Sequence, residues 1–206
     1  MFDKVGTNCL VAIDIPIGLS EKEARECDKA ARQILRPPRA SSVFSPPARP
    51  ALYAKTFQEA LRLNRTATGI GISKQSFHIM AKIREVDELM NPRMQRFVRE
   101  VHPEVTFAQL NGGPLKHSKK HAIGRLERLA ILQSAGLNIS MSWLVEQRSK
   151  LGARHVALDD LIDALACLVT ASEIRNGCSQ SLGRVEQIDA KGLTMEIVSC
   201  AARSAV

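Results

Sequence analysis

The sequence is poor in aromatic residues and has no long apolar run. One Trp, one Tyr and six Phe make up 4% of its 206 residues. So few aromatic side chains weaken the case for a protein that binds single strands by stacking every base. The longest apolar stretch, 9–19, is interrupted by Asp14 and Pro16, whereas a membrane-spanning helix needs about 20 predominantly apolar residues. We therefore expect no membrane partner.

Several patterns that mark common types of site are absent too. The five cysteines are scattered, with no CxxC pair and no histidine at ligand spacing, so neither a zinc site nor a disulfide framework is indicated. The GxxxxGKS/T, GxGxxG and GxSxG motifs are missing, which argues against a phosphate-binding loop, a dinucleotide-binding fold and a serine hydrolase. The N-terminus carries Asp3 where a signal peptide has positive charge, so we expect a cytoplasmic protein.

Positive charge is what the chain has in excess. Its 29 Lys and Arg against 21 Asp and Glu give a net charge of +8. A basic surface favours polyanionic partners such as nucleic acid or phosphorylated metabolites, although a merely solvated surface explains the same excess. The densest basic cluster is KHSKKH at 116–121. The length and composition otherwise fit a single folded domain over 1–206.

The first predicted elements are a strand and a helix. Residues 9–16 form a continuous apolar run, as a strand buried on both faces does, and Asp14 falls at its carboxyl end. Ser20 and Glu23 have the spacing of a capping box, which predicts a helix from there to Leu35.

A basic, proline-rich loop follows at 36–50. It contains five of the nine prolines, and it is either a linker or a segment that contacts a ligand. Beyond it we expect a helical insertion at about 55–95, with helices at 56–64 and 73–90 and a tight turn at 69–71.

The second half of the chain is predicted to contain one further strand and two helices. Residues 97–107 alternate in character as a strand does, with Pro103 indicating an edge or an end and Glu104 near the strand end. A helix follows the basic cluster, with Ile123, Leu126 and Leu129 facing the core. Another helix is predicted at 159–175, and the tail at 184–199 has a hairpin or an irregular ending around 189–192.

The last of these helices carries paired carboxylates. Asp160 and Asp163 are three residues apart and share a helix face, as Asp159 and Asp163 would at a spacing of four. Acids in a first helical turn commonly cap backbone N–H groups, so Asp159 and Asp160 have a purely structural alternative. Asp163 lies further in, among apolar residues, where an unpaired carboxylate is costly.

Four acids together form the candidate site. A fold that gathers Asp14, Glu104, Asp160 and Asp163 creates a negative pocket that requires bound cations or raised pKa values. Carboxylate oxygens favour Mg²⁺ or Mn²⁺, and two such ions promote phosphodiester hydrolysis. The residues expected to hold the phosphates are basic: Arg39, Arg49, Lys119 and Lys120.

Several segments that cover most of the chain follow the pattern of a known family. They are VAIDIPIGL at 11–19, CDKAAR at 27–32, SSVFSPPARPAL at 41–52, GISKQSFHIMAKIREVDEL at 71–89, EVHPEVTFAQLNGG at 100–113 and DDLIDALACLVTA at 159–171. In these segments the sequence resembles the domain of unknown function 429 family, a group of predicted RNase H-like nucleases. The resemblance implies an α/β, ribonuclease H-like fold, a mixed five-stranded sheet flanked by helices.

The resemblance also implies roles for individual residues. The DxxDALA pattern at 160–166 is similar, more distantly, to RuvC-type resolvases, in which such acids hold metal. On that analogy Asp14 is the acid of the strand beside the central one. Glu104, with Glu100 and His102 as weaker candidates, would be particular to this family.

One departure from the pattern concerns the N-terminus. Ribonuclease H-like proteins begin with a hairpin whose first strand is central and carries the primary catalytic aspartate. This chain leads almost at once into the strand that is normally fourth, so about three strands and one metal ligand are missing from the pattern. We expect either that Met1 is not the true start or that the chain is a truncated member of the family. The apolar sheet edges left exposed would favour homo-oligomers.

The leading hypothesis is a metal-dependent nuclease that cleaves DNA or RNA, and the alternative is a non-catalytic, degenerate member of the family that binds nucleic acid. Whether the chain is an enzyme stays open. A hydrolase with Glu100 and Glu104 as acid and base ranks last. Four residues along one strand would separate these carboxyls by about 13 Å, which is wider than either glycosidase geometry.

Overall fold

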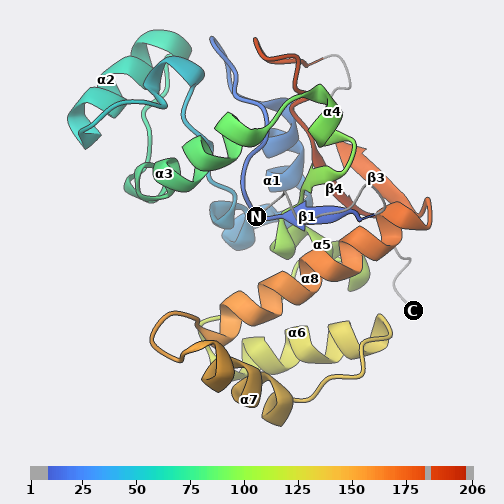
Figure 1. The fold of residues 1–206 in the computed structure, drawn as a ribbon. Coiled ribbons are helices and arrows are strands. Elements are labelled where there is room, and N and C mark those ends of the chain that lie inside the picture. Colours follow the sequence, from blue (N-terminus) through green and yellow to red (C-terminus); the bar gives the residue numbers. More distant parts are fainter. Residues whose placement is uncertain (1–8, 184–186, 203–206) are drawn as a thin grey trace.

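The computed structural model describes residues 9–183 and 187–202 and shows a mixed α/β protein (Figure 1). The strands in these residues are short: β1 (Val11–Ile13), β2 (Val98–Glu100), β3 (Ser179–Leu182) and β4 (Ile197–Cys200). β1 pairs with β2 in parallel and β3 pairs with β4 antiparallel. One parallel bridge, between Val101 and Val198, joins the two pairs, so the strands lie in the order β1, β2, β4, β3.

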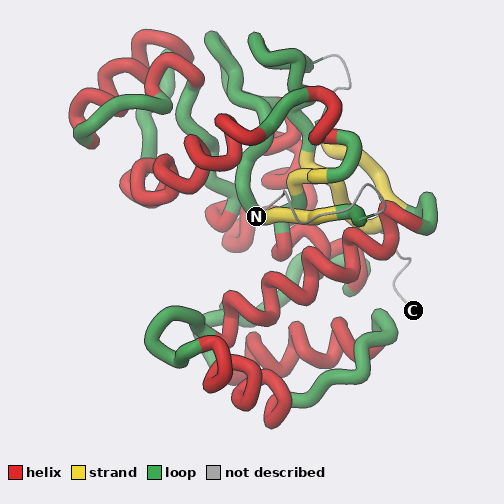
Figure 2. Tube along the Cα trace, in the orientation of Figure 1, coloured by secondary structure: helices red, strands yellow, loops and turns green. Residues whose placement is uncertain are grey.

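Helices make up most of the remaining described chain (Figure 2). They are α1 (Glu26–Arg39), α2 (Phe57–Thr68), α3 (Lys74–Leu89), α4 (Pro92–Gln95), α5 (Pro103–Leu110), α6 (Ala122–Ser134), α7 (Met141–Leu151) and α8 (Leu158–Arg175), with 3-10 turns η2 (Ala40–Ser42) and η3 (Arg49–Ala51). In Figure 1, α8 lies between the sheet and the α6–α7 pair, while α2 and α3 project at the opposite end. A core cluster that includes Phe107, Leu132, Leu144 and Ile162 joins α5, α6, α7 and α8.

Local signals explain the ends of the helical region after the proline-rich loop. The Thr56 hydroxyl accepts a hydrogen bond from the Glu59 N–H at 3.2 Å, and the Ser73 hydroxyl accepts one from the Ser76 N–H at 3.0 Å. Gly69 ends α2 with a φ of +75°, a conformation that glycine adopts without strain. The predicted helices and the tight turn between them are therefore confirmed, as is the helix over 158–175.

The predicted strand over 97–107 is wrong in its second half. The strand β2 ends at Glu100, and Pro103 begins the helix α5, so Glu104 lies in the first turn of a helix and not at a strand end. Proline suits the first helical position because its fixed φ is already helical and no N–H is needed there. Every residue of α5 from Pro103 to Gln109 is buried. The helix therefore has no face exposed to solvent, and its sequence shows no alternation of apolar and polar residues at the helical period.

The predicted start of the first helix is also wrong. The Ser20 hydroxyl does accept a hydrogen bond from the Glu23 N–H at 3.1 Å, but it closes a turn, and α1 begins only at Glu26. The reason is Arg25, whose backbone is extended and whose guanidinium reaches back to the carbonyls of Ile17 and Gly18. The segment predicted as a loop at 36–50 also contains regular structure. The end of α1, the 3-10 turn η2 and the start of the 3-10 turn η3 fall within it.

The inward face of α6 differs from the expected one. Ile123 and Leu126 are more than half exposed, while Gly124 and Arg128 are buried with Leu129. A Cβ at Gly124 would lie 2.1 Å from the Ser118 carbonyl oxygen, so only glycine allows this close approach. The close approach of residues 116–121 to α6 therefore decides which face turns inward.

The C-terminal tail forms a hairpin, which was one of the two predictions for it, the other being an irregular ending. Ile188 bridges Thr194 antiparallel, with the turn at 189–192, and residues 184–186 lie outside the described part. None of the helices in 9–183 and 187–202 has the length and apolar character that crossing a membrane requires.

Candidate functional site

A cavity of about 410 Å³ lies at the carboxyl ends of the parallel strands β1 and β2, where ligands bind in open α/β sheets. All four acids predicted from the sequence line it, and we call it the acidic cavity. Its chemically active lining comes from the ends of β1 and β2, from α5 and α8 and from the segment before α6: Asp14, His102, Glu104, Lys119, Asp160 and Asp163. The exposed Lys82 of α3 adds a further positive charge to the wall.

Asp163, in the second turn of α8, is only partly satisfied. Its Oδ2 accepts a hydrogen bond from the Lys119 ammonium, while its Oδ1 is buried with no hydrogen-bond partner among the described residues. Burial raises the pKa of Asp163 to about 6, with the charges of Asp14 and Glu104 adding to the rise and Lys119 opposing it. A buried polar atom without a partner costs free energy, so a ligand that supplied one would be stabilised there.

Asp14 faces the same cavity from the end of β1. Its side chain is exposed to the cavity, yet the surrounding walls withdraw the carboxyl from bulk water and raise its pKa. The positive charges of His102 and Lys119 work to lower that pKa, and Glu104 raises it. The charge of Asp14 in turn raises the pKa of Asp163, so the two carboxyls are within electrostatic reach of each other.

Lys119 is the cation of this cluster. Burial works to lower the pKa of Lys119, but the negative charges of Asp163, Glu104 and Asp14 raise it above its ordinary value. The ammonium therefore stays protonated at neutral pH. The sequence predicted Lys119 as a phosphate ligand, and the structure places it on Asp163.

Glu104 is engaged in a buried ion pair. The Arg128 guanidinium donates three hydrogen bonds to its two carboxylate oxygens, at 2.7, 2.7 and 3.0 Å. Arg128 is fully buried and also donates to the carbonyls of His117 and Gly124. Arg128 is not predicted from the sequence, because nothing in the pattern of α6 marks an inward arginine. Glu104 acts on the cavity through its charge while Arg128 holds both of its oxygens.

The first turn of α8 uses its acids structurally. The Asp160 carboxylate accepts a hydrogen bond from the Ala157 N–H at 2.9 Å, which caps the helix. Asp159 forms an ion pair with Lys120 at 2.5 Å. Asp160 still lines the acidic cavity, and the Lys120 side chain is 71% exposed. Lys120 therefore remains accessible to an anionic ligand.

The two predicted arginines lie elsewhere. Arg49 forms ion pairs with Asp87 of α3 and Asp189 of the tail, and it is not part of the acidic cavity. Arg39 donates a hydrogen bond to the Lys116 carbonyl at 3.4 Å, which joins the proline-rich loop to the basic cluster. Neither arginine lines the cavity that holds the predicted acids.

Glu100, a weaker candidate, is held by Arg25. The buried Arg25 guanidinium pairs with Glu100 at 2.5 Å and with Asp28 at 2.8 Å, and the Ile17 N–H donates to Glu100 at 2.6 Å. Burial raises the pKa of Glu100 to about 7 against the opposing charge of Arg25. Arg25, Asp28 and Glu100 therefore form a buried ion-pair cluster at the base of the acidic cavity, which we call the floor. No sequence motif predicted this cluster.

The donor set fits a smaller metal site than predicted. Within 9–183 and 187–202, no three His, Cys, Asp or Glu side chains are placed to hold one metal ion together. Mg²⁺ is often held by only one or two carboxylates, with waters and substrate phosphates completing its shell. Asp14 and Asp163, which line the same cavity, are the two carboxylates that would form such a site.

Comparison with known proteins bears on the family alone. The model of the family described as "Protein of unknown function (DUF429)" matches residues 1–187. The chain belongs to the DUF429 family. The segment matched to DUF429 includes all four acids of the acidic cavity. Comparisons with curated proteins and with solved structures gave no significant match.

Proposed function

We propose that this DUF429 protein hydrolyses phosphodiester bonds of nucleic acid with the help of a divalent cation, Mg²⁺ or Mn²⁺, on a ribonuclease H-like fold. The observation that carries the proposal is the buried Asp163 Oδ1, which has no hydrogen-bond partner among the described residues and belongs to a carboxylate that lines the acidic cavity together with Asp14. Asp14 and Asp163 both have raised pKa values, and a bound cation would stabilise their charged forms. The net charge of +8 favours a phosphate-bearing ligand as the partner of that cation.

In this proposal the residues of the acidic cavity have different tasks. Asp14 and Asp163 hold the cation, which when bound polarises a phosphoryl oxygen and lowers the pKa of a water molecule. Lys119 leaves Asp163 and pairs with the phosphate, while the exposed Lys120 neutralises a neighbouring phosphate. Glu104, fixed by Arg128, keeps the potential negative, and Asp160 supports the N-terminus of α8.

A second candidate function is nucleic-acid binding without catalysis. The Lys119–Asp163 ion pair favours it, because the ammonium already occupies the position in which a cation would neutralise Asp163. In that case the basic segment 116–121 binds phosphates and the acids only anchor it. A cytoplasmic location and association into homo-oligomers stay predictions under either function.

A cleavage assay tests both candidates. Single-stranded, duplex and branched DNA and RNA are incubated with Mg²⁺, Mn²⁺ or EDTA, using the wild type, Asp163→Asn and a control, Glu146→Gln, which removes a charge that is exposed on α7. Cleavage that needs the metal, is lost in Asp163→Asn and persists in Glu146→Gln is the expected result. Salt-sensitive binding without cleavage would establish the second function. Neither binding nor cleavage by the folded protein would contradict both.

A further inference from the structure

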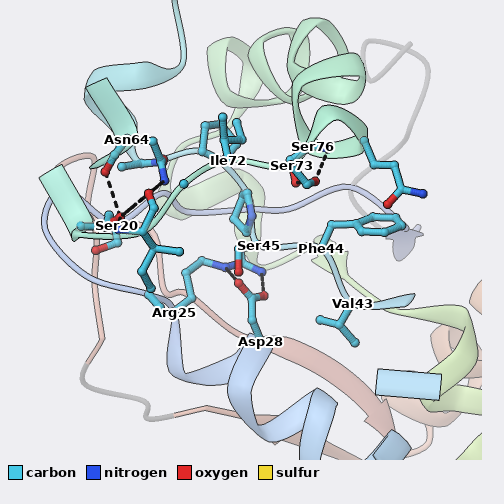
Figure 3. Close-up of a pocket in the computed structure, with 18 of the residues that line it drawn as sticks. Ser20, Arg25, Asp28, Val43, Phe44, Ser45, Asn64, Ile72, Ser73 and Ser76 are labelled. Carbon is cyan, nitrogen blue, oxygen red and sulfur yellow. Dashed lines mark hydrogen bonds and ion pairs between the residues drawn. The ribbon is translucent and has the colours of Figure 1, made fainter. Parts of the chain in front are cut away.

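A second cavity, of about 310 Å³, is shown in Figure 3 and has lining residues in common with the acidic cavity. It is formed by α1, by the segment 43–48 and by the facing ends of α2 and α3. The residues labelled around it in Figure 3 include Phe44, Ser45, Ile72, Ser73 and Ser76. We call it the serine-rich cavity.

The two cavities share a wall. Val43 and Phe44 line both of them, and so do the paired Arg25 and Asp28 of the floor. Phe44 is therefore within reach of a ligand in either cavity.

Hydrogen bonds fix this wall from both sides. The Arg32 guanidinium donates to the Val43 carbonyl at 3.0 Å and to the Ser45 hydroxyl at 2.7 Å. The His102 ring lies 3.3 Å from the Ser42 carbonyl oxygen. The backbone on both sides of Phe44 is therefore held in place, while the Phe44 side chain remains 37% exposed. An aromatic ring held in this way needs little reordering to receive a ligand.

The chemistry of the serine-rich cavity differs from that of its neighbour. Arg25 and Asp28 pair with each other at 2.8 Å, and Glu23 and Arg32 also belong to the lining. Ser73 and Ser76, whose hydroxyls hydrogen-bond to each other, line it together with apolar residues such as Ile72. This mixture of apolar surface and hydrogen-bonding groups suits a flat ring with polar edges.

We propose that the serine-rich cavity receives one nucleobase of the nucleic acid whose phosphate lies in the acidic cavity, and that this base stacks on Phe44. The inference rests on the proposed function, because it assigns a subsite to the same ligand. A base inside a duplex is stacked and paired, so only an unpaired or flipped-out nucleotide can enter. The substrate class is therefore single-stranded or locally unpaired nucleic acid. One aromatic residue suffices for a single base, so the low aromatic content does not oppose this.

The test follows the fluorescence of 2-aminopurine, which stacking quenches, in a short single-stranded DNA and in the matching RNA, with EDTA present to prevent cleavage. The variants are Phe44→Ala and Phe44→Leu, the second of which keeps apolar bulk without a π-face. The matched control is Phe97→Ala, since Phe97 is also 37% exposed but lines neither cavity.

The wild type and Phe97→Ala are expected to bind and to quench the probe. Both Phe44 variants should bind about five- to a hundredfold more weakly, with the quenching lost. Binding and quenching that are unchanged in both Phe44 variants would overturn the base subsite while leaving phosphate binding, and with it the proposed function, intact. An absence of binding by the wild type in EDTA, together with neither binding nor cleavage in Mg²⁺, would overturn both. Equal affinity for a fully paired duplex with no flipped base would also refute the subsite.

Discussion

The Lys119 ammonium donates a hydrogen bond to one carboxylate oxygen of Asp163, and the other oxygen of that carboxylate is buried without a partner among the described residues. The protein therefore supplies a partner for only one of the two oxygens of the Asp163 carboxylate. The other oxygen is buried beneath the surface of the acidic cavity, and a ligand reaches it only if Lys119 moves. Both candidate functions depend on this difference between the two oxygens of Asp163.

Removing the Asp163 charge should stabilise the fold at neutral pH. Its pKa is about 6 in the folded protein, above the ordinary value of 3.8, so ionisation costs stability as the pH rises from about 4 to 6. Asp163→Asn should raise the free energy of unfolding at pH 8 by about 1–3 kcal/mol, from a shift of about two pKa units at 1.36 kcal/mol each. Urea denaturation at pH 4 and pH 8 measures this. A variant that is less stable than the wild type at pH 8 would contradict the raised pKa.

Lys119 should compete with a divalent cation for Asp163. In Lys119→Met the competing charge is gone, and Mn²⁺ should bind about tenfold or more tightly, since a unit charge about 4 Å away is worth about 1–4 kcal/mol near a protein surface. Titration calorimetry without nucleic acid provides the measurement. Lys150→Met, which removes an exposed lysine of α7, is the control and should leave the affinity unchanged. Unchanged affinity in Lys119→Met would rule out competition.

The Arg128–Glu104 pair should be a stability element. Arg128→Met leaves Glu104 buried without its partner and should cost about 3–5 kcal/mol in the free energy of unfolding. The double variant Arg128→Met with Glu104→Gln should recover much of that loss, because no uncompensated charge remains. Chemical denaturation of the two single variants and the double variant checks this. Full additivity of the two single effects would show that the residues are not coupled.

Gly124 should reverse the usual effect of a helical Gly→Ala change. Alanine normally stabilises a helix interior by about 0.5–1 kcal/mol, but here its Cβ would meet the Ser118 carbonyl oxygen at 2.1 Å. Gly124→Ala should therefore lower the thermal midpoint and displace the segment that carries Lys119. The control is Gly113→Ala, where a Cβ would meet nothing within 4 Å. Equal midpoints for the two variants would contradict the close approach.

The sequence predicted the elements whose two faces differ. α2, α3 and α8 have polar and apolar sides, so their period is visible, and the acids at the end of β1 and on α8 do meet in one cavity. α5 was missed because it is buried on every side and shows no period. The inward face of α6 was predicted wrongly because an arginine is not expected in the core. Arg128 can be buried since its charge is paired with Glu104, 24 residues earlier in the chain. Such long-range pairs leave no local trace in a sequence.

The wall between the cavities has a consequence for how a bound strand would be positioned. Arg32 holds one end of it at Val43 and Ser45, and Arg49 holds the following stretch to Asp87 and Asp189. A shift of the segment around Phe44 toward either cavity would break these hydrogen bonds and ion pairs. The separation between a base on Phe44 and a phosphate near Asp163 is thus set by the fold. Any reaction there would occur at a constant number of nucleotides from the captured base, whatever the sequence of the strand.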